Sequence, residues 1–106
     1  MKLLRVALLA ALTSLGARAE SFSFALLGDT PYSATERALL PQELDEIGES
    51  GARFVIHIGD FKNGGSLCSD EVFADRKQLF DAAPLPVVYV PGDNDWTDCH
   101  RASNGS

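Results

Sequence analysis

The sequence predicts an α/β protein in which three parallel strands and two helices alternate in the order βαβαβ. Three apolar segments, FSFALL, FVIHI and VVYVP, each precede a Gly-Asp pair, and two segments of helical character lie between them. Alternating strands and helices with short linkers favour a parallel sheet with right-handed crossovers. The chain has 106 residues, which is enough for one modest domain.

The first 19 residues have the layout of a secretory signal peptide. Lys2 and Arg5 stand near the start, an apolar run extends from Leu3 to Leu15, and positions 17 and 19 are alanines. Cleavage after residue 19 would export residues 20–106 to the periplasm or the exterior. The apolar run is too short to span a membrane, so no membrane association is expected. The alternative is an amphipathic amino-terminal helix that belongs to the fold.

The first strand is expected over residues 22–27 and the first helix over residues 34–49. The helical period is carried by apolar side chains, namely Leu39, Leu40, Leu44 and Ile47. Pro41 lies inside this segment and should break or kink it, so two helical pieces are expected. Ser50-Gly51 ends the helix.

The second strand is expected over residues 53–58, which are apolar and β-branched, as in a strand buried on both faces. Ser69, followed by two acids, marks the start of a second helix that continues to about Ala82. The third strand is expected over residues 86–90. The closing segment RASNGS is polar and is expected to form a loop, which leaves a thin sheet with two open edges.

The mature chain is strongly acidic. Cleavage removes three of the nine basic residues and none of the fifteen acidic ones, which leaves a formal charge of −9. A protein with this charge has no general attraction to nucleic acid or to anionic lipid. If the substrate is phosphorylated, bound cations must supply the positive charge at the site.

The three Gly-Asp pairs are the main indication of function. Asp29, Asp60 and Asp93 each follow a strand and a glycine, and glycine permits a sharp turn. The carboxyl ends of parallel strands share one edge of the sheet, where open α/β folds bind ligands. Carboxylates that meet there repel each other unless a cation lies between them, and hard divalent cations prefer oxygen ligands. Each aspartate alone can equally cap the turn that follows it.

The segments around these pairs are GDTPY (residues 28–32), HIGDFKNGG (57–65) and PGDNDWTDCHR (91–101). In order and spacing they resemble the D-x-H, G-D and G-N-H-[D/E] motifs of the calcineurin-like metallophosphoesterase superfamily. More narrowly, they are similar to a branch of secreted bacterial phosphoesterases. The resemblance implies that residues 20–106 are a truncated amino-terminal part of the domain, the βαβαβ half of that family's sandwich.

The resemblance also implies hydrolysis of a small phosphorylated substrate with two metal ions such as Mn, Fe or Zn. By position, Asp60 matches the aspartate that bridges both metals, Asp29 a ligand of one metal, and Asp93 the usual asparagine ligand of the other. The metals would polarise the phosphoryl group and activate the attacking water. Asn94 and Asp95 match the pair that assists the leaving group.

Two departures weaken this match. Pro31 replaces the histidine of D-x-H, and Asn94 replaces a histidine and cannot act as a general acid. The isolated chain is therefore expected to be weakly active or inactive. The alternative is a non-catalytic metal-binding or interaction module on the same fold.

Further candidates for contact with metal or substrate are polar residues near the three motifs, namely Tyr32, Lys62, Asn63 and His100. His57, in the middle of a strand, is better explained as a buried, hydrogen-bonded histidine. Cys68 and Cys99 are the only two cysteines. In an exported chain they are expected to form a disulfide that ties together the loops after the second and third strands.

Overall fold

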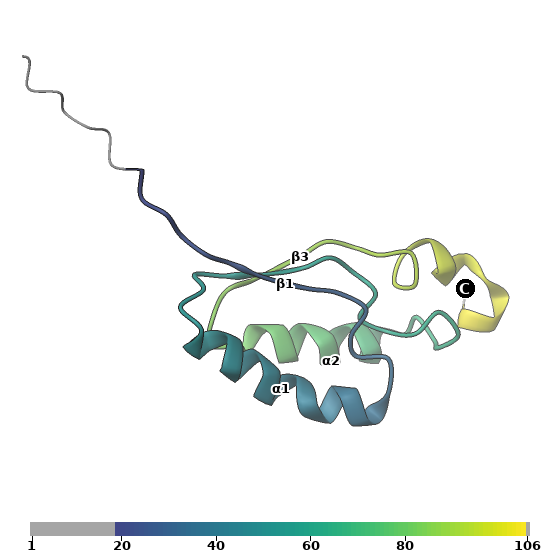
Figure 1. Ribbon diagram of the computed structural model, residues 1–106. Coiled ribbons are helices and arrows are strands. Elements are labelled where there is room, and N and C mark those ends of the chain that lie inside the picture. Colours follow the sequence, from purple (N-terminus) through teal and green to yellow (C-terminus); the bar gives the residue numbers. More distant parts are fainter. Residues whose placement is uncertain (1–18, 106) are drawn as a thin grey trace, which may run out of the picture.

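A computed structural model describes residues 19–105 of the protein, so the predicted signal peptide lies almost wholly outside the described residues. Strands β1 (Ala25–Leu27), β2 (Val55–His57) and β3 (Val87–Tyr89) form one parallel sheet in the order β1-β2-β3. Both helices, α1 (Ala34–Glu49) and α2 (Asp70–Asp81), lie on the same side of this sheet (Figure 1). The predicted α/β class and parallel sheet are confirmed, although each strand is shorter than expected.

Helix α1 is continuous over 16 residues, so the predicted break at Pro41 is wrong. A proline removes one backbone hydrogen bond from a helix interior, and here the burial of Leu40 (0% exposed) and Leu44 (2%) holds both halves against the sheet. The helix begins where the Ser33 hydroxyl accepts a hydrogen bond from the Glu36 N–H at 3.2 Å. It ends at Ser50, followed by Gly51 with φ 86°, as the sequence predicted.

Helix α2 begins at Ser69, whose hydroxyl caps the Val72 N–H, and ends before Pro84. It packs on the sheet mainly through aromatic side chains. The rings of Phe61 and Phe73 meet edge to face at 5.0 Å, and Phe80 lies 5.0 Å from His57. The core of the described domain is therefore a single layer between the sheet and its two helices.

The other face of the sheet is uncovered, which corrects the expectation that the second strand (residues 53–58) is buried on both faces, since Ile58 is 51% exposed. Leu26 and Val88 lie in register with Ile56 in neighbouring strands and are 61% and 52% exposed. Their neighbours that point toward the helices, Val55 and His57, are 1% and 0% exposed. The sequence shows apolar residues on both faces, but the helices cover only one.

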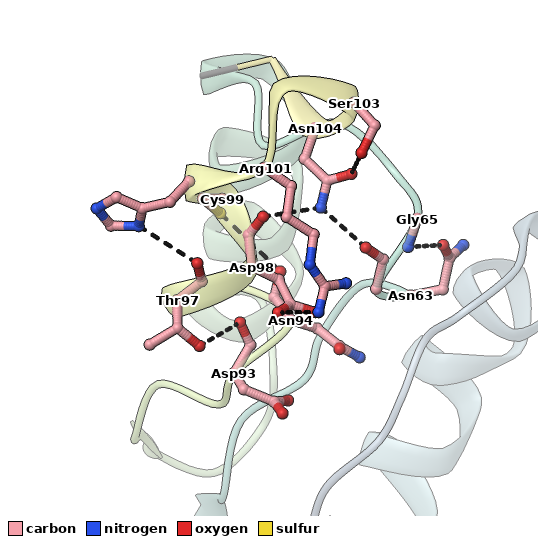
Figure 2. A network of polar contacts seen from close by, with 12 residues as sticks. Asn63, Gly65, Asp93, Asn94, Thr97, Asp98, Cys99, Arg101, Ser103 and Asn104 are labelled. Carbon is pink, nitrogen blue, oxygen red and sulfur yellow. Dashed lines mark hydrogen bonds and ion pairs between the residues drawn. The ribbon is translucent and has the colours of Figure 1, made fainter.

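The carboxyl-terminal segment is ordered into two short 3₁₀ helices, η1 (Thr97–His100) and η2 (Ala102–Asn104), rather than the expected loop. Asn104 is fully buried, and its Nδ2 donates to the carbonyls of Gly64 (2.8 Å) and Asp98 (3.0 Å) (Figure 2). These bonds fasten the end of the chain to the loop that follows β2. Within residues 19–105, no helix has the length and apolar character needed to span a membrane.

Candidate functional site

The segments after the three strands pack against each other at the carboxyl edge of the sheet. The Asp29 N–H donates to the Gly59 carbonyl at 3.2 Å. A Cβ atom added to Gly59 would lie 2.1 Å from the Gly92 nitrogen, and one added to Gly92 would lie 2.1 Å from Asp60 Oδ1. Glycine is therefore required at positions 59 and 92 because the neighbouring backbone approaches so closely.

Asp29 and Asp60 adopt left-handed backbone conformations, with φ of 57° and 60°. They are the only non-glycine residues with positive φ among residues 19–105. Aspartate tolerates this conformation better than most residues, but it still costs about 1 kcal/mol or more. The sequence predicted that the glycines would make the turns; at Gly28 the following aspartate takes the positive φ instead. Such outliers concentrate at functional sites.

The hydroxyl of Tyr32 joins the two aspartates. It donates to Asp29 Oδ1 at 2.6 Å and lies 3.5 Å from Asp60 Oδ2. The hydrogen bond to Asp29 raises the pKa of the Tyr32 hydroxyl well above its usual value, and burial and the charges of both aspartates add to the shift. Two carboxylates and a phenol oxygen from two different strand ends therefore meet at one point.

Asp60 is the more buried of the two carboxylates. Its Oδ1 accepts a hydrogen bond from the Asn94 N–H at 3.0 Å. Burial raises the pKa of the Asp60 carboxyl, the Asn94 bond opposes this, and the negative charges of Asp93 and Asp95 add to it. The environment of Asp60 is thus one in which an added positive charge would be favourable.

Asp93 is close enough to influence Asp60 electrostatically, but its side chain is exposed. Its main-chain carbonyl accepts bonds from the N–H groups of Trp96 (3.2 Å) and Asp98 (2.8 Å), which starts the turn into η1. No three side chains of His, Cys, Asp or Glu within residues 19–105 form a group that could hold a metal ion. Of the three predicted acids, the structure brings together Asp29 and Asp60.

Asn94 reaches the same point from the β3 side. Its Nδ2 donates to the Lys62 carbonyl at 3.1 Å and lies 3.4 Å from the Tyr32 hydroxyl. The amide therefore borders the Asp29–Asp60 pair, where it can donate a hydrogen bond but cannot transfer a proton. The structure thus places Asn94 beside the Asp29–Asp60 pair.

Asp95 is buried behind the Asp29–Asp60 pair and holds the backbone of the site in place. It is 2% exposed, and its Oδ1 accepts from the N–H groups of Asp60 (2.9 Å) and Gly92 (3.1 Å). Its Oδ2 accepts from the Tyr89 hydroxyl. Burial, followed by the hydrogen bond and charge of Asp95, raises the pKa of Tyr89 above its usual value. Asp95 is thus a positioning residue that ties the ends of β2 and β3 together.

His57 is fully buried and uses both ring nitrogens within the fold. Its Nε2 lies 2.8 Å from the Thr30 carbonyl, and its Nδ1 accepts from the Gly59 N–H at 3.2 Å. A carbonyl can only accept and an amide N–H can only donate, so the proton resides on Nε2. The interpretation of His57 as a structural histidine is confirmed. Pro31 is also buried.

Asn63 and Lys62 shape the loop beside the site. Asn63 donates to the Tyr32 carbonyl at 3.0 Å. Its side-chain oxygen accepts from the Gly65 N–H at 3.0 Å (Figure 2). Lys62 is 2% exposed, and no pattern of residues around it indicates a buried lysine. Burial lowers the pKa of its ammonium group, and the charges of Asp95 and Asp98 oppose this shift.

The predicted disulfide between Cys68 and Cys99 is present and connects the loop after β2 to η1. A disulfide is typical of proteins in an oxidising compartment, which agrees with export. His100, another predicted candidate, is exposed in η1, and its Nδ1 lies 3.3 Å from the Thr97 carbonyl. It lines a separate cavity of about 380 Å³ beside Trp96 and the disulfide.

The roles of Tyr89 and Asn104 were not predicted. Tyr89 occupies the helix-facing position in β3 that His57 occupies in β2. A tyrosine on a buried face needs a partner for its hydroxyl, and the acid six residues later could have suggested Asp95. Nothing in the sequence around Asn104 indicates that it is buried.

Comparison of the chain with protein-family models, with curated proteins and with solved structures gives no match. The motifs and the geometry of the site are therefore the grounds for a functional assignment.

Proposed function

We propose that the protein is a metal-dependent phosphoesterase, an exported member of the calcineurin-like class. The supporting observation is the meeting of Asp29 and Asp60 at the carboxyl edge of the sheet, joined by the Tyr32 hydroxyl. Both aspartates have a left-handed backbone, and they come from neighbouring parallel strands. Unfavourable backbone conformations are typical of functional sites, and here they direct two carboxylates to a shared point.

The oxygens at this point suit a hard divalent cation. Asp29, Asp60 and Tyr32 offer carboxylate and phenol oxygens, which Mn²⁺ and related ions bind. The side chains that would hold a metal are thus the two carboxylates, with Asp93 the remaining candidate. A bound divalent ion supplies Lewis-acid activation of the phosphoryl group and of water.

The residues around the carboxylates would orient the substrate. Asn94 can donate a hydrogen bond to a phosphate oxygen from its Nδ2, which already lies near Tyr32. Asp95 fixes the Asp60 backbone through its N–H. The described residues contain no histidine beside the pair that could protonate the leaving group, since His57 is committed to the fold. We therefore expect slow turnover, fastest with leaving groups that need no protonation.

Turnover of p-nitrophenyl phosphate and bis-p-nitrophenyl phosphate with added Mn²⁺ tests the proposal. Asp60→Asn keeps an oxygen that can accept from Asn94 but removes the charge, so we expect a loss of about 100-fold or more in kcat/KM. Asp45→Asn is the matched control, because Asp45 is exposed on α1, and it should leave turnover unchanged. Equal turnover by Asp60→Asn and the parent chain would exclude the catalytic role.

The alternative function is a non-catalytic module that binds a cation. It is favoured by the amide of Asn94, which stands beside the two aspartates where a proton donor would be needed for catalysis. Calorimetric titration with Mn²⁺ separates the two functions. Binding that is lost in Asp60→Asn, with no turnover of either ester, would favour the module over the enzyme.

A further inference from the structure

A second feature lies beside the Asp29–Asp60 pair: a cavity of about 200 Å³ between the start of α1, the middle of α2 and the loop after β2. Three basic side chains line it, namely Arg37, Lys62 and Arg76. Residues 19–105 contain six basic residues, so half of them line this one cavity. No carboxylate is among the lining residues, although the chain as a whole is strongly acidic.

Lys62 is the most deeply buried of the three cations. It is 2% exposed, and its Nζ donates to the carbonyls of Asn63 (3.1 Å) and Ser66 (3.0 Å). Within residues 19–105 it forms no ion pair with a carboxylate. Burying an ammonium group without an opposite charge in contact is costly. An anion in the cavity would provide that charge.

The two arginines share a single carboxylate. Arg37 Nε lies 3.2 and 3.1 Å from the two oxygens of Asp75, and Nη2 of Arg37 and Nη1 of Arg76 also pair with Asp75. Arg76 Nε donates to the Phe61 carbonyl at 2.9 Å. Nη1 of Arg37 and Nη2 of Arg76 have no hydrogen-bond partner within residues 19–105, so each guanidinium retains donors for another group.

The charges at the cavity therefore do not balance. Asp75 is the one carboxylate that pairs with these cations, and it holds the two arginines in place. The charges of Asp95, Asp98 and Asp60 act on Lys62 but form no ion pair with it. Guanidinium donors suit the oxygens of a phosphate, which can accept two bonds from one arginine. The start of α1 offers an anion fewer backbone N–H donors, because the Tyr32 N–H already donates to the Glu36 carboxylate.

The cavity adjoins the proposed catalytic pair through Tyr32. This residue lines the cavity, while its hydroxyl contacts Asp29 and lies 3.5 Å from Asp60. Asn63, also in the lining, donates to the Tyr32 carbonyl at 3.0 Å. A molecule with one anionic group at the aspartates could thus have a second one in the cavity.

We propose that this cavity binds a phosphate-type oxyanion, and that the substrate of the site is a small molecule with a second phosphate besides the one hydrolysed. The statement on the substrate depends on the proposed phosphoesterase function. The statement on the anion site does not, because its three cations act without a metal.

Binding of inorganic phosphate, measured by calorimetry with a chelator present, tests the anion site separately. We expect binding to the parent chain and a loss of about tenfold or more in affinity for Arg37→Gln and for Lys62→Met. Lys77→Gln is the matched control, since it removes one positive charge from α2 outside the cavity. Two results would overturn the proposal: no binding of phosphate to the parent chain, or an equal loss of phosphate affinity in Arg37→Gln and Lys77→Gln. The second result would show that phosphate responds only to the net charge of the protein.

Lys62→Met replaces a buried residue and can unfold the chain, which circular dichroism would reveal. Arg37→Gln then decides the outcome, because the Arg37 side chain is 42% exposed and its loss is tolerable. Asp60→Asn should bind phosphate as the parent chain does under these metal-free conditions. Phosphate binding by the parent chain without turnover of either nitrophenyl ester in the presence of Mn²⁺ would refute the catalytic function and retain the anion site.

A second comparison distinguishes free phosphate from a phosphate carried by a larger substrate. With Mn²⁺, a sugar bisphosphate should have a higher kcat/KM than the matching monophosphate, through a lower KM. Arg37→Gln should abolish this preference while turnover of the monophosphate persists. A parent chain that turns over both sugars equally would refute the second phosphate as a feature of the substrate.

Discussion

Replacing Asp95 by alanine tests the inference that one buried carboxylate holds the site together. Its two oxygens accept from three donors, the N–H groups of Asp60 and Gly92 and the hydroxyl of Tyr89. Alanine would leave all three donors without their partner in a part of the protein where Asp95 itself is 2% exposed. The carboxylate would also no longer join the ends of β2 and β3.

An unsatisfied buried donor costs about 1–3 kcal/mol. Three donors, partly rehydrated by water that enters the gap, give an expected loss of about 3–6 kcal/mol in the free energy of unfolding. The total free energy of unfolding of a small domain is about 5–10 kcal/mol, so the variant should be severely destabilised. Asp95→Asn should cost less than about 1.5 kcal/mol, because its oxygen can accept both N–H bonds while its NH₂ donates to the tyrosine oxygen.

Urea unfolding followed by far-ultraviolet circular dichroism measures these differences. Tyr89→Phe removes only one of the three donors and should cost about 1–2 kcal/mol. Asp45→Ala, on the exposed side of α1, should lie within about 0.5 kcal/mol of the parent chain. If Asp95→Ala unfolds within about 1 kcal/mol of the parent chain, the role assigned to Asp95 is refuted.

Three further predictions concern the frame of the site. Reduction of Cys68–Cys99, which are 31 residues apart, should lower stability by about 3–4 kcal/mol; equal urea midpoints with and without reductant would contradict this. Gly59→Ala should lower the free energy of unfolding by more than about 2 kcal/mol, because φ is 100° and the added Cβ would meet Gly92. Gly51→Ala, with φ 86° and nothing within 4 Å of the added Cβ, should lower it by about 1 kcal/mol. Equal urea midpoints for the two variants would contradict the close approach at Gly59. The hydrogen bond from Arg37 holds the pKa of Asp75 below 3.8, so the stabilisation from this pair is complete above that pH and is lost as the pH falls through the lower folded value. Carboxyl-carbon NMR titration should show the Asp75 midpoint rising toward 3.8 in Arg37→Gln, and an unchanged midpoint would refute the assignment.

The alternation of strands and helices could be predicted because each element carries a local signal. Ser69 starts α2 by capping it, Gly51 ends α1, and the three apolar runs became the three parallel strands. Pro41 was misleading because local propensity counts the lost hydrogen bond but not the burial of Leu40 and Leu44 on either side.

The candidate site could be predicted only in part. Three carboxylates at strand ends follow from topology, and Asp29 and Asp60 do meet. Their contact through Tyr32, and the exposed position of Asp93, depend on backbone angles that the residue types do not determine. The burial of Lys62 and Asn104 likewise depends on how the disulfide-linked loops fold over each other, which a pattern of residue types does not encode.

The left-handed backbone at Asp29 and Asp60 has a consequence for any attempt to make this protein more robust. Glycine would relax either turn and asparagine would fit it comfortably, each at a gain of up to about 1 kcal/mol. Directed evolution for heat resistance alone should therefore replace these two aspartates early. Under the proposed phosphoesterase function, selection for ester cleavage should restore them. Asp29 and Asp60 would then be positions at which higher thermal stability is obtained at the expense of the proposed activity.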